Sequence, residues 1–130
     1  MLHNTVTYRT GRGWDASLPA AMDGPQTLVL AFAASEFAGN SGPFAELAAT
    51  FPQSVLVGCS TSGEIAGTQV HDASISVAVT RFDHTRLRRA MTVIDNAGDS
   101  FDAGVRLADQ LAGEGLRFVR RHVGDRPFER

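Results

Sequence analysis

The chain has 130 residues, enough for one domain whose core buries roughly two-thirds of the surface that the unfolded chain exposes. A formal net charge of -2 and a pI near 6.0 give no broad positive field that would attract nucleic acid or an anionic membrane surface. All 12 basic residues are arginine and only one residue is cysteine, which excludes lysine Schiff-base chemistry, the P-loop lysine and an intrachain disulfide.

Residues 1–26 are rich in glycine, proline, aspartate and threonine, and we interpret them as an N-terminal lead-in segment. A short apolar patch around Leu18 and Met22 is long enough for one helical turn. Trp14 is expected to be a surface anchor that packs on the domain, in preference to a ligand-binding aromatic side chain.

A βαβ unit follows the lead-in segment. Thr27 to Phe32 is a continuous apolar run, which is typical of a central strand covered on both faces. Pro43 is a suitable first residue for a helix that ends at Phe51, because the next residue is proline. Ser54 to Cys59 is a second apolar run, so the pattern predicts two parallel strands joined by one helix.

The second half of the pattern predicts a hairpin and a closing helix. Ser74 to Phe82 alternates between apolar and polar residues, and only two residues separate it from a second expected strand, Thr85 to Ile94. A helix is expected from about Ser100 to Leu111, with Asp99 or Ser100 as its N-cap and with an apolar face formed by Phe101, Val105, Ala108 and Leu111. The predicted fold class is therefore α/β (α+β mixed): a β-α-β-β-β-α mixed sheet covered by helices, in a domain spanning residues 27–116.

Residues 117–130 do not continue this pattern, since they hold five arginines and no apolar strand. Two interpretations remain open. Either the chain is truncated or altered in reading frame near Leu116, or these residues form a basic, solvated tail.

Polar chemistry is concentrated between Gly58 and Glu64, a segment with three hydroxyls, one thiol and one carboxylate. It follows a strand that we expect to be buried, where open α/β sheets place their ligands, so it predicts a binding loop; a plain polar turn is the alternative. A nucleophile elbow is excluded because Ser62 stands where that motif requires glycine, and a P-loop is excluded because Glu64 follows Gly63 where it requires lysine.

Cys59 leaves one enzymatic alternative open, a thiolate activated by His71 or His84. The competing interpretation is a small, inert core cysteine, and it is the one that we favour. The four histidines show no metal-ligand spacing, and no cofactor motif is recognised, so we expect neither a metal nor a cofactor.

The nine residues Val57 to Ile65 resemble the signature of the N-terminal domain of the FIST (F-box and intracellular signal transduction) family. Their surroundings agree with that family's pattern: Phe51-Pro52 before the strand, Gly67 after the signature, and the two strand patterns Thr27 to Phe32 and Ser74 to Phe82. The resemblance covers about residues 27 to 112, and it implies that residues 27–116 are an incomplete FIST N-terminal domain.

The resemblance implies a non-catalytic sensory input domain of a signal transduction protein that binds a small ligand, with an amino acid or related metabolite suggested. A FIST C-terminal domain or another signalling output domain is the implied protein partner. The positions implied to face the ligand are those of the signature: Cys59, Ser60, Thr61, Ser62, Gly63 and Glu64. For an amino acid, Glu64 would accept hydrogen bonds from the ammonium group, and the loop's hydroxyl and N–H groups would receive the carboxylate.

Location and other partners are also expectations. Met1 to Tyr8 contains no signal-peptide h-region, and no apolar run approaches the ~18 residues that a membrane span requires, so we expect a cytoplasmic protein without membrane or nucleic-acid partners. Arg86, Arg88 and Arg89 form a basic cluster on the expected hairpin, where Arg86 and Arg88 would share a strand face. We interpret the cluster as charge that protects an exposed edge strand from aggregation, and docking of a phosphate or an acidic partner is the alternative. A non-binding interaction scaffold remains the third functional alternative.

Overall fold

The computed structural model describes residues 1–66, 68–71 and 73–113. It divides the chain into two compact units, Met1–Leu87 and a second unit that begins at Arg88. Residues 117–130, for which truncation and a basic tail are the open interpretations, lie outside the described residues.

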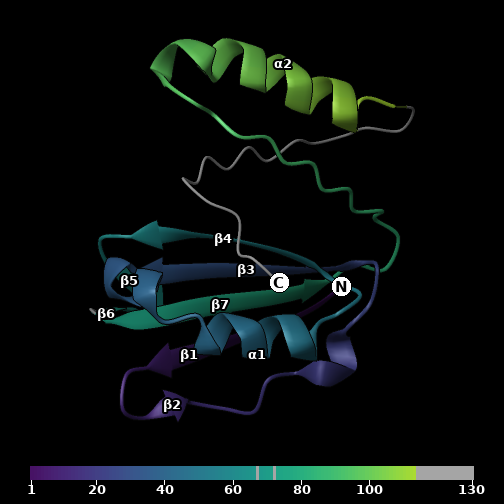
Figure 1. Cartoon of the computed structure of the whole chain (residues 1–130). Coiled ribbons are helices and arrows are strands. Elements are labelled where there is room, and N and C mark those ends of the chain that lie inside the picture. The colour runs from purple at the N-terminus through teal and green to yellow at the C-terminus, as the bar shows by residue number, and fades with distance from the viewer. Residues whose placement is uncertain (67, 72, 114–130) are drawn as a thin grey trace. The chain divides into compact units, whose positions relative to one another are not determined.

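The first unit is built on a five-stranded mixed sheet with the strand order β2-β1-β7-β3-β4 (Figure 1). Strands β3 and β4 are parallel, and the other neighbouring pairs are antiparallel. The mixed sheet and the parallel pair confirm the prediction from sequence. The bounds of the strands are β1 Leu2–Arg9, β2 Gly13–Trp14, β3 Thr27–Ala34, β4 Val55–Thr61 and β7 Ser74–Arg81.

Helix α1 (Gly42–Thr50) connects the two parallel strands, as predicted from the sequence. Pro43 lies in its first turn, where the missing N–H removes no helical hydrogen bond. The Asn40 side-chain oxygen accepts a hydrogen bond from the Gly42 N–H (3.2 Å), and Phe51 caps the carboxyl end before Pro52. Two short 3-10 turns, η1 (Ala20–Met22) and η2 (Ser35–Gly39), flank β3, and η1 is the helical turn expected in the lead-in segment.

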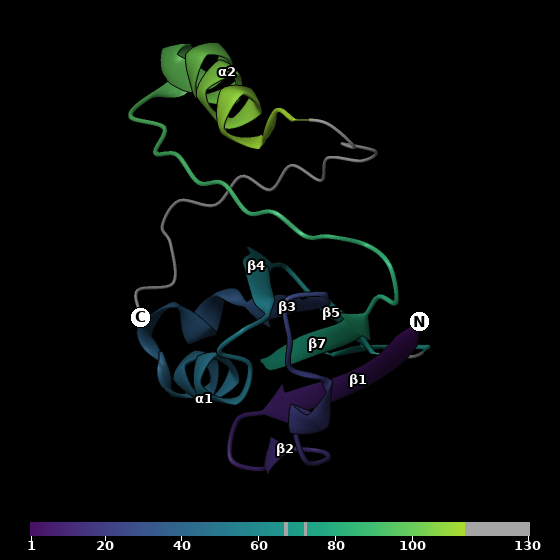
Figure 2. The same ribbon diagram turned by 90° about the vertical axis from the view of Figure 1, so that its right-hand side faces the viewer.

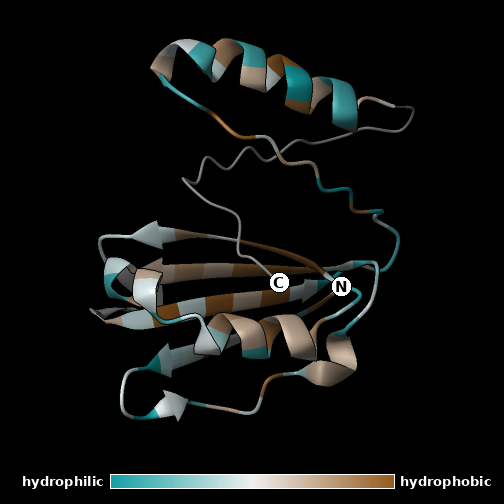
Figure 3. Ribbon diagram, viewed as in Figure 1, coloured by the Kyte–Doolittle hydropathy of each residue, from teal (hydrophilic) through white to brown (hydrophobic). Residues whose placement is uncertain are grey.

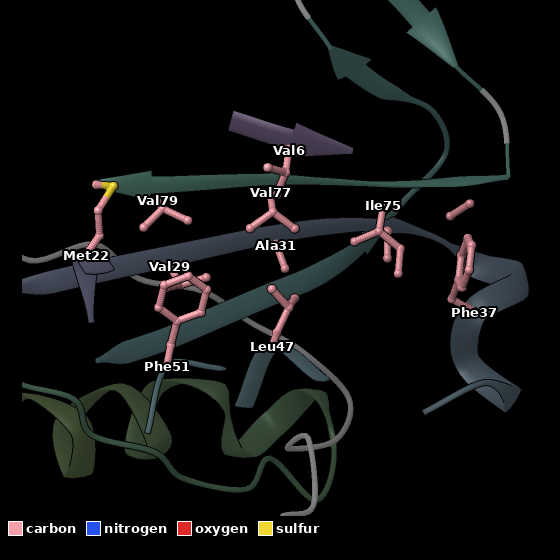
Figure 4. Packing of buried hydrophobic residues seen from close by; sticks show 12 residues of the cluster. Val6, Met22, Val29, Ala31, Phe37, Leu47, Phe51, Ile75, Val77 and Val79 are labelled. Carbon is pink, nitrogen blue, oxygen red and sulfur yellow. The ribbon is translucent and has the colours of Figure 1, made fainter. Parts of the chain in front are cut away.

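The core lies between α1 and one face of the sheet (Figures 2 and 4). Leu47 and Phe51 point from α1 and its cap toward the sheet, and both are almost fully buried. They meet a layer of small and β-branched side chains from the three central strands, because alternate residues of a strand face the same side. That layer consists of Val6, Val29, Ala31, Ile75, Val77 and Val79. Figure 3 shows hydrophobic residues concentrated on β3, β7 and α1.

The second face of β3 differs from the expectation of a strand covered on both sides. Leu28, Leu30 and Phe32 are only half-buried, whereas Val29 and Ala31 on the α1 face are buried. Burial therefore alternates along a sequence that is apolar throughout. The continuous run predicted the central position of β3 correctly but not the partial exposure of one of its faces.

The sequence analysis assigned no strand to the lead-in segment and expected one over residues 85–94, and the structure shows the reverse. The lead-in segment supplies β1, which pairs with β7 along its whole length from Leu2–Arg81 to Arg9–Ser74. Strand β7 thus has β1 on one side and β3 on the other, so neither edge is free for a hairpin partner. Residues 85–94 accordingly form no strand. Without that strand, Arg86 and Arg88 do not share a strand face, and the protective role assigned to the basic cluster loses its basis.

The chain segment between β4 and β7 forms a separate two-stranded sheet. Strands β5 (Glu64–Ala66) and β6 (Gln69–His71) pair antiparallel, with Glu64 opposite His71. No strand was expected from the sequence over residues 64–71.

The second unit contains a 3-10 turn, η3 (Ala97–Asp99), that leads into helix α2 (Ser100–Leu111). The bounds of α2 and Asp99 as its N-cap confirm the prediction, although the Asp99 side chain pairs with Arg106 and makes no capping hydrogen bond. The Arg106 guanidinium donates to both carboxylate oxygens of Asp99 (3.1 and 2.9 Å), and this bond lowers the pKa of Asp99 below 3.8. Phe101 (80% exposed) and Val105 (44%) lie on the predicted apolar face. Over the described residues, no helix has the length and hydrophobicity that crossing a membrane requires.

Candidate functional site

A small pocket lies where the parallel strands β3 and β4 end. Ala34, the last residue of β3, pairs with Thr61, the last residue of β4. The residues that come after the two strands in the chain therefore lie at the same edge of the sheet. The pocket has a volume of about 110 Å³. Its lining residues come from the ends of both strands and from the start of β7: Ala34, Ser35, Glu36, Thr61, Ser62, Gly63 and Ala73.

The β3 side of the pocket is positioned by the turn η2. Phe37 in this turn is buried (4% exposed), and its ring packs against the Tyr8 ring in a T-shaped arrangement with centroids 5.8 Å apart. Burial of Phe37 fixes the two residues before it, Ser35 and Glu36, which are exposed and line the pocket. An apolar anchor thereby holds a hydroxyl and a carboxylate at the open edge of the sheet.

The β4 side shows that the expected loop is shorter than the sequence suggested. Residues 58–61 belong to β4, and β5 begins at Glu64, so only Ser62 and Gly63 form the bend. The extended strand has a simple cause: Thr61 pairs with Ala34, and its Oγ1 lies 3.5 Å from the Ala33 carbonyl oxygen, to which it donates. The polar segment therefore continues the sheet before it turns.

Of the six residues predicted to face a ligand, three line the pocket, two do not, and one has a side chain outside the described structure. Thr61, Ser62 and Gly63 line the pocket. Cys59 is half-buried within β4, Ser60 is exposed, and neither is part of the lining. Glu64 is the first residue of β5, and its side chain lies outside the described structure.

Sequence reasoning missed the contribution of β3 to the pocket. Ser35 and Glu36 directly follow a strand that was correctly predicted as parallel to β4, and the carboxyl ends of parallel strands meet at one edge. That rule applied to the first strand would have found both residues. Among the described residues, the side chains of Glu36 and Ser62 form no hydrogen bond or ion pair, so their polar atoms are available to a solute.

Ala73 completes the pocket from the β7 side in a strained conformation. Its φ of 51° is the left-handed region, which costs a non-glycine residue about 1–2 kcal/mol. Strain of this kind is often retained at binding sites, where surrounding structure holds it in place. No sequence signal identified this residue.

The structure gives no support to activation of Cys59 by His84. Cys59 lies opposite Phe32, which pairs with Ser76 near the start of β7, whereas His84 follows the far end of that strand. The rise of a strand places Ser76 and Arg81 about 17 Å apart. The Asp83 carbonyl accepts a hydrogen bond from the Gln26 side chain (3.2 Å), which keeps this segment at the amino end of β3. The side chain of His71, the other candidate base, is outside the description.

No group of three or more histidine, cysteine, aspartate or glutamate side chains gathers in metal-binding geometry within the described part of the chain. The pocket lining, likewise, offers one carboxylate and three hydroxyls. Such a set is suited to hydrogen bonding with a small polar solute.

Fold and site together define a class: a small α/β domain with a solute-sized polar pocket at the carboxyl ends of its parallel strands. The FIST N domain model matches residues 27–127, which is most of the chain. The chain therefore belongs to the FIST N domain family, and the resemblance found in the sequence is confirmed. At this coarse level it is a sensory domain of signal transduction. No curated protein and no solved structure matches it.

Proposed function

We propose that this domain senses a small polar metabolite, with an amino acid or a close relative as the ligand, and that it binds this ligand without transforming it. The observation that carries the proposal is the pocket between the ends of β3 and β4, which combines the signature residues Thr61, Ser62 and Gly63 with Ser35 and Glu36. Signature and pocket coincide in three residues, although the signature was identified without the fold.

The chemistry of the lining matches the two ends of an amino acid. The Glu36 carboxylate accepts hydrogen bonds from an ammonium group, and charge-assisted bonds of this kind are stronger than neutral ones. The hydroxyl groups of Ser35 and Ser62 and the backbone N–H groups of the bend donate to a carboxylate. Glu36 is therefore a second candidate for the role that the sequence suggested for Glu64, whose side chain lies outside the described residues.

The size of the pocket restricts the ligand further. A volume of about 110 Å³ is well below the roughly 300–1,000 Å³ of sites for drug-sized ligands. It corresponds to the space of three to four water molecules, at about 30 Å³ each. We therefore expect a ligand with a small side chain, or a larger one of which only the polar head enters.

A thermal-shift screen of amino acids and related metabolites tests the proposal. A ligand that binds only the native state adds RT ln(1 + [L]/Kd), about 2.7 kcal/mol at a hundredfold excess over Kd. We expect Glu36→Gln to abolish the shift caused by the ligand. Glu46→Gln, a matched loss of a carboxylate on α1 and outside the pocket, should leave it unchanged. Absence of a shift with every compound would favour the interaction scaffold instead.

The thiol-enzyme alternative has a separate test. An activated thiolate reacts rapidly with iodoacetamide at neutral pH, whereas an inert core thiol reacts slowly. We expect slow alkylation of Cys59, because it is half-buried within β4 and is not part of the pocket lining. Rapid alkylation that a bound metabolite suppresses would replace the sensing proposal with an enzymatic one.

The sensing proposal includes a cytoplasmic location and a protein to which the signal passes, either a FIST C-terminal domain or another output domain. Membership of the FIST N domain family supports this role. A binding assay between this chain and a candidate output domain, with and without the ligand from the screen, tests it. Ligand that leaves the affinity of the two proteins unchanged would count against signal transfer.

A further inference from the structure

A second concave surface lies in the first unit, between the segment that follows β2 and helix α1. It is an open groove of about 470 Å³ and shares no lining residue with the pocket at the ends of β3 and β4. The end of β2 and the segment after it supply one wall, and α1 supplies the other: Trp14, Ala16, Ser17, Leu18 and Ala20 on one side, Glu46 and Thr50 on the other.

Trp14 is held rigidly at this groove. Its ring packs edge-on against the Tyr8 ring, with centroids 5.2 Å apart and an interplanar angle of 70°. Its Nε1–H donates to Oε2 of Glu46 (2.8 Å). The side chain is half-exposed and lines the groove. Trp14 is therefore the surface anchor expected from the sequence, and the groove also gains a fixed aromatic wall from it.

The charge of Glu46 is not compensated by a cation. Its partner is the indole N–H, which is neutral, and among the described residues Glu46 forms no ion pair. A carboxylate beside an indole ring attracts cations in two ways: directly through its charge, and through the negative face of the aromatic system. An anion is repelled by this corner, and a neutral donor gains only a hydrogen bond without the attraction between opposite charges.

The rest of the lining adds an apolar surface beside this charged corner. Ala16, Leu18 and Ala20 contribute aliphatic groups, while Ser17 and Thr50 add polar groups to the same lining. The volume falls within the roughly 300–1,000 Å³ typical of small-ligand sites. We propose that the groove binds an organic cation, a guanidinium or alkylammonium group on a short aliphatic stem, with Glu46 and Trp14 as the recognition pair. This site is independent of the proposed metabolite pocket.

Trp14 is the only tryptophan of the chain, so its indole N–H signal and its fluorescence report on this groove alone. We would titrate the full chain with n-butylguanidinium and, separately, with n-butylurea, its neutral counterpart of nearly the same shape. We expect a saturable change in both Trp14 signals with the guanidinium compound, and at least a tenfold weaker response to the urea. Equal responses to the two compounds would overturn the proposal.

Glu46→Gln is the decisive variant, because its amide oxygen still accepts from the Trp14 N–H while the charge is lost. We expect it to weaken n-butylguanidinium binding at least tenfold. Glu36→Gln, which removes a carboxylate from the other pocket, should have no effect on this binding. Unchanged binding by Glu46→Gln would overturn the proposal, and if this variant does not fold, the comparison of the two compounds on the native chain decides alone.

The cation can belong to a free metabolite or to an arginine side chain of a polypeptide, and a further titration distinguishes these sources. A Gly-Arg-Gly tripeptide with blocked ends is added in place of n-butylguanidinium. Saturation by the small compound supports a free amine or guanidine, and saturation by the tripeptide alone supports a polypeptide partner. No saturable response to either one would overturn the proposal.

Discussion

The two ends of the parallel strands β3 and β4 differ in how their polar groups are satisfied. At the amino end, Oδ1 of Asp23 accepts from the Ser54 hydroxyl (2.6 Å) and from the Gln53 N–H (3.1 Å). The Ser54 oxygen accepts in turn from the Gly24 N–H (3.2 Å). At the carboxyl end, Glu36 and Ser62 have no such partners among the described residues and line a pocket.

This difference indicates which end stabilises the fold and which is available to a ligand. Polar groups that bond to each other join the segment before β3 to the start of β4 and contribute to the free energy of folding. Polar groups that face a cavity contribute little until a solute binds there. Substitutions at the two ends should therefore affect stability and binding separately.

The largest expected effect comes from the core that both ends share. Leu47 is 0% exposed, so Leu47→Ala should lower the free energy of unfolding by about 2–5 kcal/mol, measured by urea denaturation. Leu2→Ala is a matched control, since Leu2 on β1 is 59% exposed and its loss should cost less than about 0.5 kcal/mol. Equal losses in the two variants would contradict the assigned core.

The next effect tests the amino end. Asp23→Ala leaves the buried Ser54 hydroxyl and the Gln53 N–H without their acceptor, which should cost about 1–3 kcal/mol of stability. Asp23→Asn retains an oxygen acceptor and should cost less. Denaturation midpoints of the two variants provide the measurement, and an Asp23→Ala variant as stable as the native chain would remove the distinction between the two ends.

The carboxyl end should behave in the opposite way. Glu36→Gln and Ser62→Ala each change an exposed side chain without a partner among the described residues, so the unfolding free energy should change by at most about 0.5 kcal/mol. Any metabolite that raises the melting temperature of the native chain should lose this effect in both variants. A loss of stability comparable to that of Asp23→Ala would show that these groups are structural.

The smallest expected effect comes from the exposed ion pair between Asp99 and Arg106 in the second unit, with which the effects at the two ends of the strands can be compared. The hydrogen bond from Arg106 lowers the pKa of Asp99 below 3.8. The ion pair therefore stabilises the folded second unit fully above that pH, and this contribution is lost as the pH falls through the lowered pKa. The helicity of α2, followed by Cα chemical shifts, should therefore decline slightly between about pH 5 and about pH 2. Asp99→Asn should remove this component, and high salt should weaken it because the pair is exposed. A pH profile of Asp99→Asn identical to the native one would contradict the role of this pair.

Local signals in the sequence were sufficient for the helices. The Pro43 start and the Phe51-Pro52 end fix α1 through the dihedral angles of proline, and α2 begins and ends where its apolar spacing predicted. The parallel pairing of β3 and β4 also followed from the sequence, because a single helix between two apolar strands favours a crossover. The signature residues Thr61, Ser62 and Gly63 were found because polar groups are concentrated directly after an apolar strand pattern and match the family signature.

The errors concern which segment pairs with the second edge of β7, a choice that the local sequence does not specify. Val6 and Tyr8 gave β1 a weak alternating pattern, and only its pairing with β7 shows that this segment is a strand. Residues 85–94 have a comparable pattern but no free strand edge to join. A strand is stabilised by its neighbours, so two similar segments compete for one edge and the sequence of either alone does not reveal which one occupies it.

The amino-acid sequence by itself determined the class of the fold, the bounds of both helices and the family to which this chain belongs. Those features depend on contacts and dihedral preferences within short segments. Only the tertiary structure decided that Glu36 joins the signature at one pocket and that Trp14 meets Glu46 at another surface, since 25 or more residues separate the partners in each case. Contacts between residues so far apart in the sequence depend on which strand edges and helix faces pack together, and that packing is a property of the whole first unit.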